Sequence, residues 1–307
     1  MKKAIITGAN SFIGYRLCRK LAQNGWFVYA VIRKDNANND VLIQNKNIKI
    51  IYSSMEIYGK LDDVIEDSCD VGIALAWNGT RGAARNDEKK QKENFLYSID
   101  CLNVFSLLGC KKILTAGSQA EYGPWFEKRK ITEEDECRPN TEYGKYKLEL
   151  YKRALEFCSE KHISFVEPRF FSLYGDDDNE KTMIVSMIRN MIQNKVCNLT
   201  KCIQLWDFLY VDDAITAVYK LIVSETASGV YNIGSGVSKP LKKYVLEMAE
   251  LTSTHSELKF GVVPYPVTGI VNTNPSIKKL CKDVEWIPTI SFPEGIKKVI
   301  QRQRASI

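Results

Sequence analysis

The sequence predicts an α/β fold: a doubly wound parallel sheet joined to a smaller, discontinuous α/β lobe. Two observations predict it. Residues 4–32 follow the order strand, glycine-containing turn, helix and strand, which is the order of a dinucleotide-binding unit. Short apolar runs then alternate with helical patterns as far as about residue 168, and this alternation favours a parallel sheet with helices on both faces.

The first unit carries the strongest local signal. Ala4–Thr7 and Phe27–Ile32 are apolar runs of strand length. In the turn between them Gly8 would permit a tight bend, and Gly14 would let the helix pack closely on the strand. Ser11 stands where the usual pattern has its middle glycine. A helix that begins here would point its amino terminus at a pyrophosphate. We therefore expect the turn to bind a dinucleotide through Gly8, Asn10, Ser11, Phe12, Ile13 and Gly14.

Further apolar runs supply the rest of the sheet. The pattern becomes less regular after about residue 168 and shows no clean linker. We expect residues 1–168 and 207–233 to form the sheet domain, and residues 169–206 and 234–307 to form the second lobe. The predicted strands are 48–51, 71–75, 112–115, 164–167 and 230–233, and the predicted helices include 89–109 and 143–161.

Composition excludes several classes of protein. The chain has 307 residues and a formal charge of +6, without a basic tract interleaved with aromatic residues, so nucleic-acid binding is disfavoured. No apolar run approaches the length of a membrane span. The nine cysteines show no Cys-x-x-Cys spacing and only two histidines are present, which disfavours a metal site and a disulfide framework. These features indicate a cytoplasmic protein without metal, membrane or nucleic-acid partners.

Tyr143 and Lys147 form a candidate catalytic pair. They are four residues apart in a segment with helical character, so both side chains would lie on one helix face. A nearby ammonium favours the phenolate, and Lys147 would therefore lower the pKa of Tyr143. Such a pair is suited to moving a proton to or from a hydroxyl or carbonyl oxygen.

Together these segments resemble a known family. The chain is similar to the extended short-chain dehydrogenases/reductases, in the group of nucleotide-sugar epimerases, dehydratases and reductases, and the resemblance implies a Rossmann fold. It runs through nearly the whole length. The residues that carry it are 7–14, 74–76, 117–123, 168–175, 207–213, 231–234 and 286–288, with Asn94, Tyr143 and Lys147.

The resemblance also implies roles for individual residues. The family places a serine or threonine four residues before the tyrosine of a Tyr-Gly pair, which selects Ser118 ahead of Tyr122. Ser118 would hydrogen-bond the reacting oxygen, Tyr143 would be the general acid, and Lys147 would hold the cofactor ribose. Further cofactor contacts are implied for Leu75, Ala76, Pro168, Phe170 and Phe171, and substrate contacts for Ser118, Gln119, Glu121, Tyr122, Ser172 and Trp206.

Departures from the family pattern bear on which of the family's reactions the chain can perform and on the shape of its substrate pocket. Family dehydratases carry an Asp-Glu pair directly after the active-site threonine, whereas this chain has Gln119 and Ala120. Neither residue can act as a carboxyl acid or base, so dehydration is disfavoured. Glu121 comes one residue later and would either hydrogen-bond a sugar hydroxyl or form an ion pair with a lysine. Ser172 and Trp206 stand where the family often has asparagine and arginine, which indicates a reshaped substrate pocket.

The end of the second strand bears on the cofactor. Members that retain NAD usually carry an aspartate there, and this chain has Ile32 followed by Arg33 and Lys34. Two cations without a carboxylate favour a 2′-phosphate and hence NADP(H), although the nearby Asp35 leaves NAD(H) open.

A loop after the fourth strand adds a hint about the substrate. Residues 77–82 resemble the corresponding segment of reductases that make deoxyhexose nucleotides, the fucofuranose-precursor and abequose-type enzymes. Trp77 would pack on a sugar face or near the nicotinamide, and Arg81 would contact substrate. The alternative is that Trp77 is buried packing and Arg81 is solvated.

These observations predict an NADPH-dependent reductase of a nucleotide-activated keto sugar, an NDP-4-keto-6-deoxyhexose, that serves surface-polysaccharide synthesis. The alternatives are a 4-epimerase with retained NAD and a non-catalytic regulator that binds NAD(P). The resemblance also implies a homodimer formed through helices 89–109 and 143–161.

Overall fold

A parallel sheet forms the centre of the larger lobe. The computed structural model describes residues 1–33, 42 and 44–306, so Lys34 lies outside the described residues. The strand order is β12-β7-β5-β4-β1-β2-β3, with β6 beside β7, and every neighbouring pair is parallel. The strands are β1 (Lys3–Thr7), β2 (Phe27–Ile32), β3 (Ile48–Tyr52), β4 (Val71–Ala74), β5 (Lys112–Thr115), β6 (Gly117–Ser118), β7 (Ser164–Phe170) and β12 (Gly229–Ile233).

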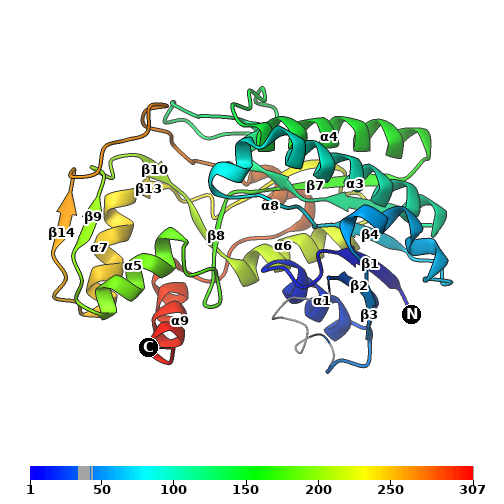
Figure 1. Ribbon diagram of the computed structural model, residues 1–307, viewed down its shortest axis with the longest axis horizontal. Coiled ribbons are helices and arrows are strands. Elements are labelled where there is room, and N and C mark those ends of the chain that lie inside the picture. Colours follow the sequence, from blue (N-terminus) through cyan, green and yellow to red (C-terminus); the bar gives the residue numbers. More distant parts are fainter. Residues whose placement is uncertain (34–41, 43, 307) are drawn as a thin grey trace.

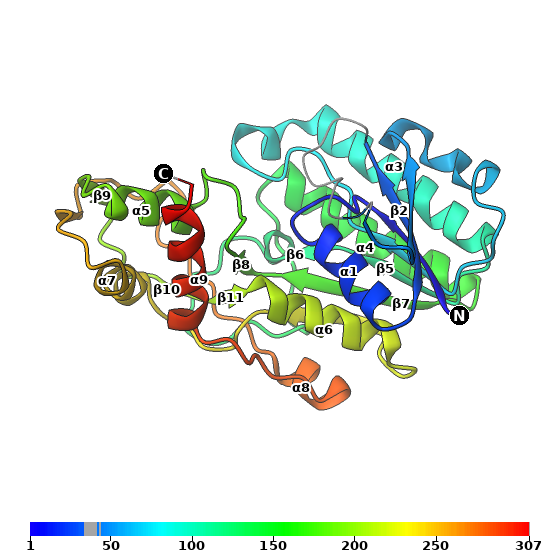
Figure 2. The same cartoon turned by 90° about the horizontal axis from the view of Figure 1, so that it is seen from below.

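Helices cover both faces of this sheet (Figure 1). Alternate residues of β1 point to opposite faces: Ala4 and Ile6 belong to one hydrophobic cluster and Ile5 belongs to the other. Figure 2 shows α1 and α6 on one face and α3 and α4 on the other. Among the described residues, no helix combines the length and apolarity that a membrane span requires. These helices are α1 (Gly14–Gln23), α3 (Glu88–Leu107), α4 (Glu142–Glu160) and α6 (Val211–Val223).

The observed elements agree closely with the prediction. The strands and the two long helices begin and end within a few residues of the expected positions, and β7 continues three residues beyond 167, to Phe170. One segment of the predicted second lobe lies elsewhere. Helix α8 (Lys278–Val284) packs against α6 and β12 of the larger lobe, because the chain returns to the sheet domain before its last helix.

The smaller lobe is built mainly from three helices and short strand pairs. Helices α5, α7 and α9 pack on one another, and Figure 1 shows them at the end of the molecule away from the sheet. The elements are α5 (Met183–Ile192), α7 (Leu241–Thr252) and α9 (Phe292–Arg304), with the pairs β9 (Cys197–Leu199) and β14 (Leu258–Phe260), and β10 (Leu205–Trp206) and β13 (Lys239–Pro240).

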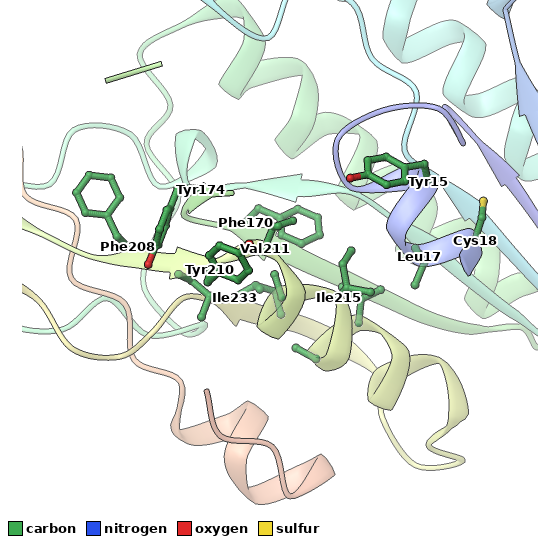
Figure 3. Packing of buried hydrophobic residues seen from close by; sticks show 14 of the residues in the cluster. Tyr15, Leu17, Cys18, Phe170, Tyr174, Phe208, Tyr210, Val211, Ile215 and Ile233 are labelled. Atoms are coloured by element: carbon green, nitrogen blue, oxygen red, sulfur yellow. The ribbon is translucent and has the colours of Figure 1, made fainter. Parts of the chain in front are cut away.

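Aromatic side chains join the two lobes. Strands β8 (Ser172–Tyr174) and β11 (Phe208–Tyr210) pair in parallel just beyond the end of β7. Tyr174 makes edge-on contacts with Phe208 and Tyr210 at centroid distances of 6.1 and 5.4 Å, and Figure 3 shows this group beside Phe170. Because these rings are buried in a shared core, the lobes meet through a packed junction.

Candidate active site

A cleft between the two lobes collects most of the predicted site residues. Its cavity volume is about 560 Å³, and the carboxyl ends of the parallel strands contribute to its wall, which is where open α/β sheets bind ligands. The predicted residues that line it are Ser11, Phe12, Ile13, Leu75, Trp77, Arg81, Ser118, Gln119, Tyr143, Lys147, Phe170, Phe171, Ser172 and Trp206.

The glycine turn has the geometry expected of a dinucleotide cradle. Gly8 has a φ of +68°, and a Cβ there would lie 2.7 Å from the backbone nitrogen of Ala76. A Cβ on Gly14 would lie 2.2 Å from the carbonyl oxygen of Gly8. The Ser11 hydroxyl accepts a hydrogen bond from the Gly14 N–H at 3.1 Å. The turn therefore has no room for side chains at either glycine, and α1 begins against it with its amino terminus facing the cleft.

Replacement of Gly14 by alanine is expected to weaken binding of the dinucleotide at least tenfold and to destabilise the fold by about 1–3 kcal/mol, because the added methyl forces the backbone apart. Titration with NAD(H) and NADP(H) and thermal unfolding measure the two effects. The matched control is Gly59→Ala, where the nearest atom to the new Cβ would be 3.8 Å away. Unchanged binding by Gly14→Ala would contradict the assignment of this turn.

Ser118 is held by a short helical turn. The three-residue helix η3 (Gln119–Glu121) begins with a capping box: the Ser118 N–H donates to Glu121 Oε1 at 2.7 Å, and the Ala120 N–H donates to the Ser118 hydroxyl at 3.2 Å. A Cβ on Gly144 would lie 2.4 Å from the carbonyl oxygen of Ala120. Helix α4 thus approaches η3 backbone to backbone, which brings Tyr143 to Ser118.

Tyr143 and Lys147 lie on one face of α4, as predicted, and both are buried, with exposed fractions of 8 % and 4 %. The Lys147 ammonium donates to the carbonyl oxygen of Ala116 at 2.7 Å and lies 3.8 Å from the centre of the Trp77 ring. The Trp77 ring in turn meets Tyr143 edge-on at 6.1 Å. The cleft therefore contains a phenol, a hydroxyl and an ammonium, of which the phenol and the ammonium are largely buried. This combination suits proton transfer to a carbonyl oxygen.

The groups that set the pKa of Tyr143 differ from the one that the sequence predicts, Lys147. Burial, the largest effect, raises the pKa of Tyr143, while a hydrogen bond with Ser118 and the charge of Arg85 lower it. Lys147 was expected to provide this lowering; its own pKa falls to about 8 because burial disfavours its charge. The groups that lower the pKa of the phenol are therefore Ser118, through its hydrogen bond, and Arg85, through its charge.

A buried charge cluster lies behind Ser118. Arg169 donates from Nε to Glu121 at 2.8 Å and to Glu167 at 2.9 Å, and all three side chains are almost inaccessible. Burial and the charge of Glu121 raise the pKa of Glu167. Glu121 therefore forms an ion pair with an arginine rather than contacting a sugar hydroxyl, and it supports Ser118 from behind.

Tyr122 also departs from its predicted role. Its side chain is 2 % exposed and packs in a small cluster with Ile131 and Phe171, and its hydroxyl donates to Asn232 at 2.8 Å. Tyr122 does not line the cleft. It is the residue directly after η3, and its ring packs in the interior, so it is a packing residue.

Two residues of α3, Gln91 and Asn94, organise the loop that carries Trp77 and Arg81. The fully buried Gln91 accepts from the Trp77 indole N–H at 2.7 Å and donates to the carbonyl oxygens of Gly79 and Ala84 at 3.1 and 2.8 Å. Asn94 accepts from the backbone N–H of Asn78 and donates to its carbonyl oxygen. Asn94 carries part of the family resemblance, but the roles of Gln91 and Arg85 could not be predicted from the sequence, since their partners are brought to them only when the loop is folded.

The cleft offers unpartnered polar atoms to a ligand. Among the described residues, Gln119 Oε1 and Trp206 Nε1 are buried and have no hydrogen-bond partner. Both residues line the cleft and an adjoining side pocket of about 220 Å³. A buried donor and a buried acceptor of this kind each need a partner, which a polar substrate would supply. Arg81 is exposed and pairs with Asp178 at 3.3 Å.

The remaining predicted cofactor residues surround the cradle. The Leu75 and Ala76 backbone abuts Gly8, and Pro168 is a buried residue of β7 that does not line the cleft. Asn10 is buried in the turn. Arg33 is exposed just beyond the end of β2. A hydrogen bond with Ser54 is the main cause that lowers the pKa of Glu56, and the charge of Arg33 adds to it. The tight glycine cradle and the neighbouring apolar wall fit a dinucleotide, whose pyrophosphate would contact the turn at residues 8–14 and whose nicotinamide end would approach Tyr143 and Lys147.

Comparison with known proteins agrees with this geometry. The NAD dependent epimerase/dehydratase family matches residues 4–234, three-quarters of the chain, including the glycine turn, Ser118, Tyr143 and Lys147. The chain belongs to this family. It is therefore an enzyme of a nicotinamide-dependent class, with the fold described above.

Relatives within the NAD dependent epimerase/dehydratase family have different reactions. CDP-abequose synthase of Salmonella muenchen is 25% identical over 97% of both chains, and UDP-glucuronate 4-epimerase of Thermodesulfobacterium geofontis is 24% identical over 99% of this chain and 96% of its own. Among solved structures, UDP-glucose 4-epimerase of Thermotoga maritima, with UDP-glucose, has a TM-score of 0.88 at 20% identity over 99% of both chains. UDP-glucuronic acid 4-epimerase of Bacillus cereus, in complex with NAD, has a TM-score of 0.85, also at 20% identity and 99% coverage of both chains.

Proposed function

We propose that the protein reduces a keto group on a nucleotide-activated sugar, an NDP-4-keto-6-deoxyhexose, with NADPH as the hydride donor. The observation that carries this proposal is the meeting of Ser118, Tyr143 and Lys147 in one cleft while Gln119 and Ala120 provide no carboxyl acid or base beside them. Proton transfer to a reduced carbonyl is supported, and elimination of water is not.

The proposed roles of the residues combine their positions in the cleft with the roles that the family resemblance implies. Bound reduced nicotinamide would supply the hydride to the carbonyl carbon. Ser118 would donate a hydrogen bond to the carbonyl oxygen as negative charge develops there, and Tyr143 would deliver its phenolic proton to that oxygen. The Lys147 ammonium would bind the ribose hydroxyls. Gln119 and Trp206 would use their unpartnered atoms to hold sugar hydroxyls.

The choice of NADPH rests on the end of β2. Arg33 is exposed there, and an arginine at this point favours a 2′-phosphate. NADH is the alternative donor, and a comparison of the affinities for NADPH and NADH by fluorescence titration distinguishes them.

The second candidate function is 4-epimerisation with retained NAD, favoured by the similarity to UDP-sugar 4-epimerases. The same three residues would serve it, because an epimerase removes and returns the hydride at one carbon. It would show nicotinamide surviving purification and no net consumption of NADPH. A non-catalytic regulator is disfavoured by the intact Ser118, Tyr143 and Lys147.

The experiment that tests the proposal follows the absorbance of reduced nicotinamide. NADPH and NADH are each offered with a panel of dTDP-, CDP-, GDP- and UDP-linked 4-keto-6-deoxyhexoses. Oxidation that disappears in Tyr143→Phe supports the reductase and identifies the nucleotide. Epimerised product without oxidation would replace the reductase by the epimerase.

We also propose a cytoplasmic homodimer that serves surface-polysaccharide synthesis. Helices α3 and α4 pack side by side and carry exposed leucines, Leu96 and Leu155, which would be covered by a second copy. Light scattering determines the mass in solution.

A further inference from the structure

A half-buried arginine faces the candidate proton donor. Arg85 lies on the short helix η2 (Gly82–Asn86), and its guanidinium carbon is 4.8 Å from the centre of the Tyr143 ring. The Lys147 ammonium is farther from the same ring centre, at 6.0 Å. Within the described part of the chain, no carboxylate forms an ion pair with Arg85, although carboxylates pair with most of the other arginines. Its charge is therefore directed at the phenol without an acidic partner.

The loop that carries Arg85 is fixed at several points. Gln91, which is completely buried, donates to the carbonyl oxygen of Ala84, the residue directly before Arg85, at 2.8 Å. The same amide accepts from the Trp77 indole N–H, and Trp77 meets the edge of Tyr143. A single buried glutamine thus sets the position of two side chains that contact the Tyr143 ring.

We infer that Arg85 is a positioning residue for proton transfer: its guanidinium stabilises the phenolate that Tyr143 becomes after it gives its proton to the substrate. The inference rests on the proposed role of Tyr143. In the reductive direction, hydride from reduced nicotinamide reaches the carbonyl carbon, the C=O π electrons move to oxygen, and the Tyr143 proton bonds to that oxygen. The phenolate that remains carries a full negative charge in a buried place, and a cation nearby lowers its free energy.

Lys147 cannot provide this effect at all pH values. Its pKa is about 8, so its charge is lost as the pH rises through that value. An arginine keeps its charge throughout the accessible range. The other groups that act on Tyr143 are Ser118, whose hydrogen bond favours the phenolate, and Glu121, whose charge opposes it. Of these neighbours, Arg85 supplies the guanidinium that lies against the Tyr143 ring.

The test measures ionisation of Tyr143 without substrate. The protein is labelled with 3-fluorotyrosine, because fluorine lowers the phenol pKa and brings ionisation closer to the pH range in which proteins stay folded. The fluorine NMR signal of Tyr143 is identified by its absence in Tyr143→Phe. We expect Arg85→Met to raise the ionisation midpoint by about one pH unit, and Arg85→Lys to raise it less.

The matched control is Arg153→Met on α4, an exposed arginine paired with Glu156, which should leave the midpoint unchanged. Thermal unfolding verifies that each variant is folded. Equal phenolate fractions in Arg85→Met and the parent protein at every pH would overturn the inference. A lower fraction in Arg85→Met would support it, even if no keto sugar is reduced, so failure of the proposed function remains distinguishable. With an active substrate, turnover by Arg85→Met should fall about tenfold and the pH profile should shift in the same direction.

Discussion

Tyr143→Phe is expected to reduce turnover by about a hundredfold to ten-thousandfold. The substitution removes one hydroxyl and leaves the ring, so the contacts with Trp77 and Arg85 persist while the proton for the substrate oxygen is lost. Binding of the dinucleotide should change little, since Lys147 and the glycine turn remain. Steady-state kinetics and a cofactor titration measure the two quantities separately.

The control for this substitution lies on the same helix. Tyr146 is half-buried and packs on Phe95 at a ring distance of 6.1 Å, so Tyr146→Phe should retain full turnover. Full activity in Tyr143→Phe would contradict the role of Tyr143 as the acid.

Lys147 adds a pH dependence to the activity. Its pKa is about 8, so activity that requires the ammonium should decline as the pH rises through this value.

Arg169→Met is expected to destabilise the protein by about 3–5 kcal/mol. Two inaccessible carboxyl groups, those of Glu121 and Glu167, would lose the guanidinium that now binds both. Chemical denaturation measures the free energy of unfolding. Burial and the charge of Glu121 already raise the pKa of Glu167, and loss of the cation would raise it further above its value in the unfolded chain. The contribution of Glu167 to the stability of the variant would therefore be fully present at low pH and would be lost as the pH rises through the folded-state pKa.

Arg153→Met serves as the matched control here too, because its ion pair with Glu156 is exposed and such pairs contribute less than about 1 kcal/mol. A further check replaces Glu167 by glutamine in the Arg169→Met background. Since one buried charge is removed, part of the stability should return. A cost below about 1 kcal/mol for Arg169→Met would mean that water or rearrangement replaces the guanidinium.

Much of the fold could be predicted because its signals are local. The turn at residues 8–14 and the apolar runs on either side of it specify a strand, a bend and a helix within thirty residues. The lobe boundaries were harder to predict. Helix α8 contacts β12 and α6 although α7, before it in the chain, and α9, after it, both pack in the smaller lobe, and nothing in a seven-residue amphipathic helix indicates which surface it will cover.

In the candidate site, too, local features could be predicted from the sequence and contacts between distant residues could not. The spacing of Tyr143 and Lys147 predicts a shared helix face, and the structure confirms it. The partners of Glu121 could not be predicted, because Arg169 is 48 residues away and the pair exists only where β6 lies beside β7. Arg85 was missed for a related reason: an arginine in a polar loop resembles a surface charge until Gln91 fixes the loop over Tyr143.

The contact between Gly144 and Ala120 has a consequence for evolution and engineering. A close main-chain approach helps to set the separation of Ser118 from Tyr143, since a Cβ on Gly144 would lie 2.4 Å from the carbonyl oxygen of Ala120 and 3.0 Å from the Pro139 side chain. Changes in the side chains that line the cleft can therefore alter what the cleft admits while Ser118 and Tyr143 keep their separation.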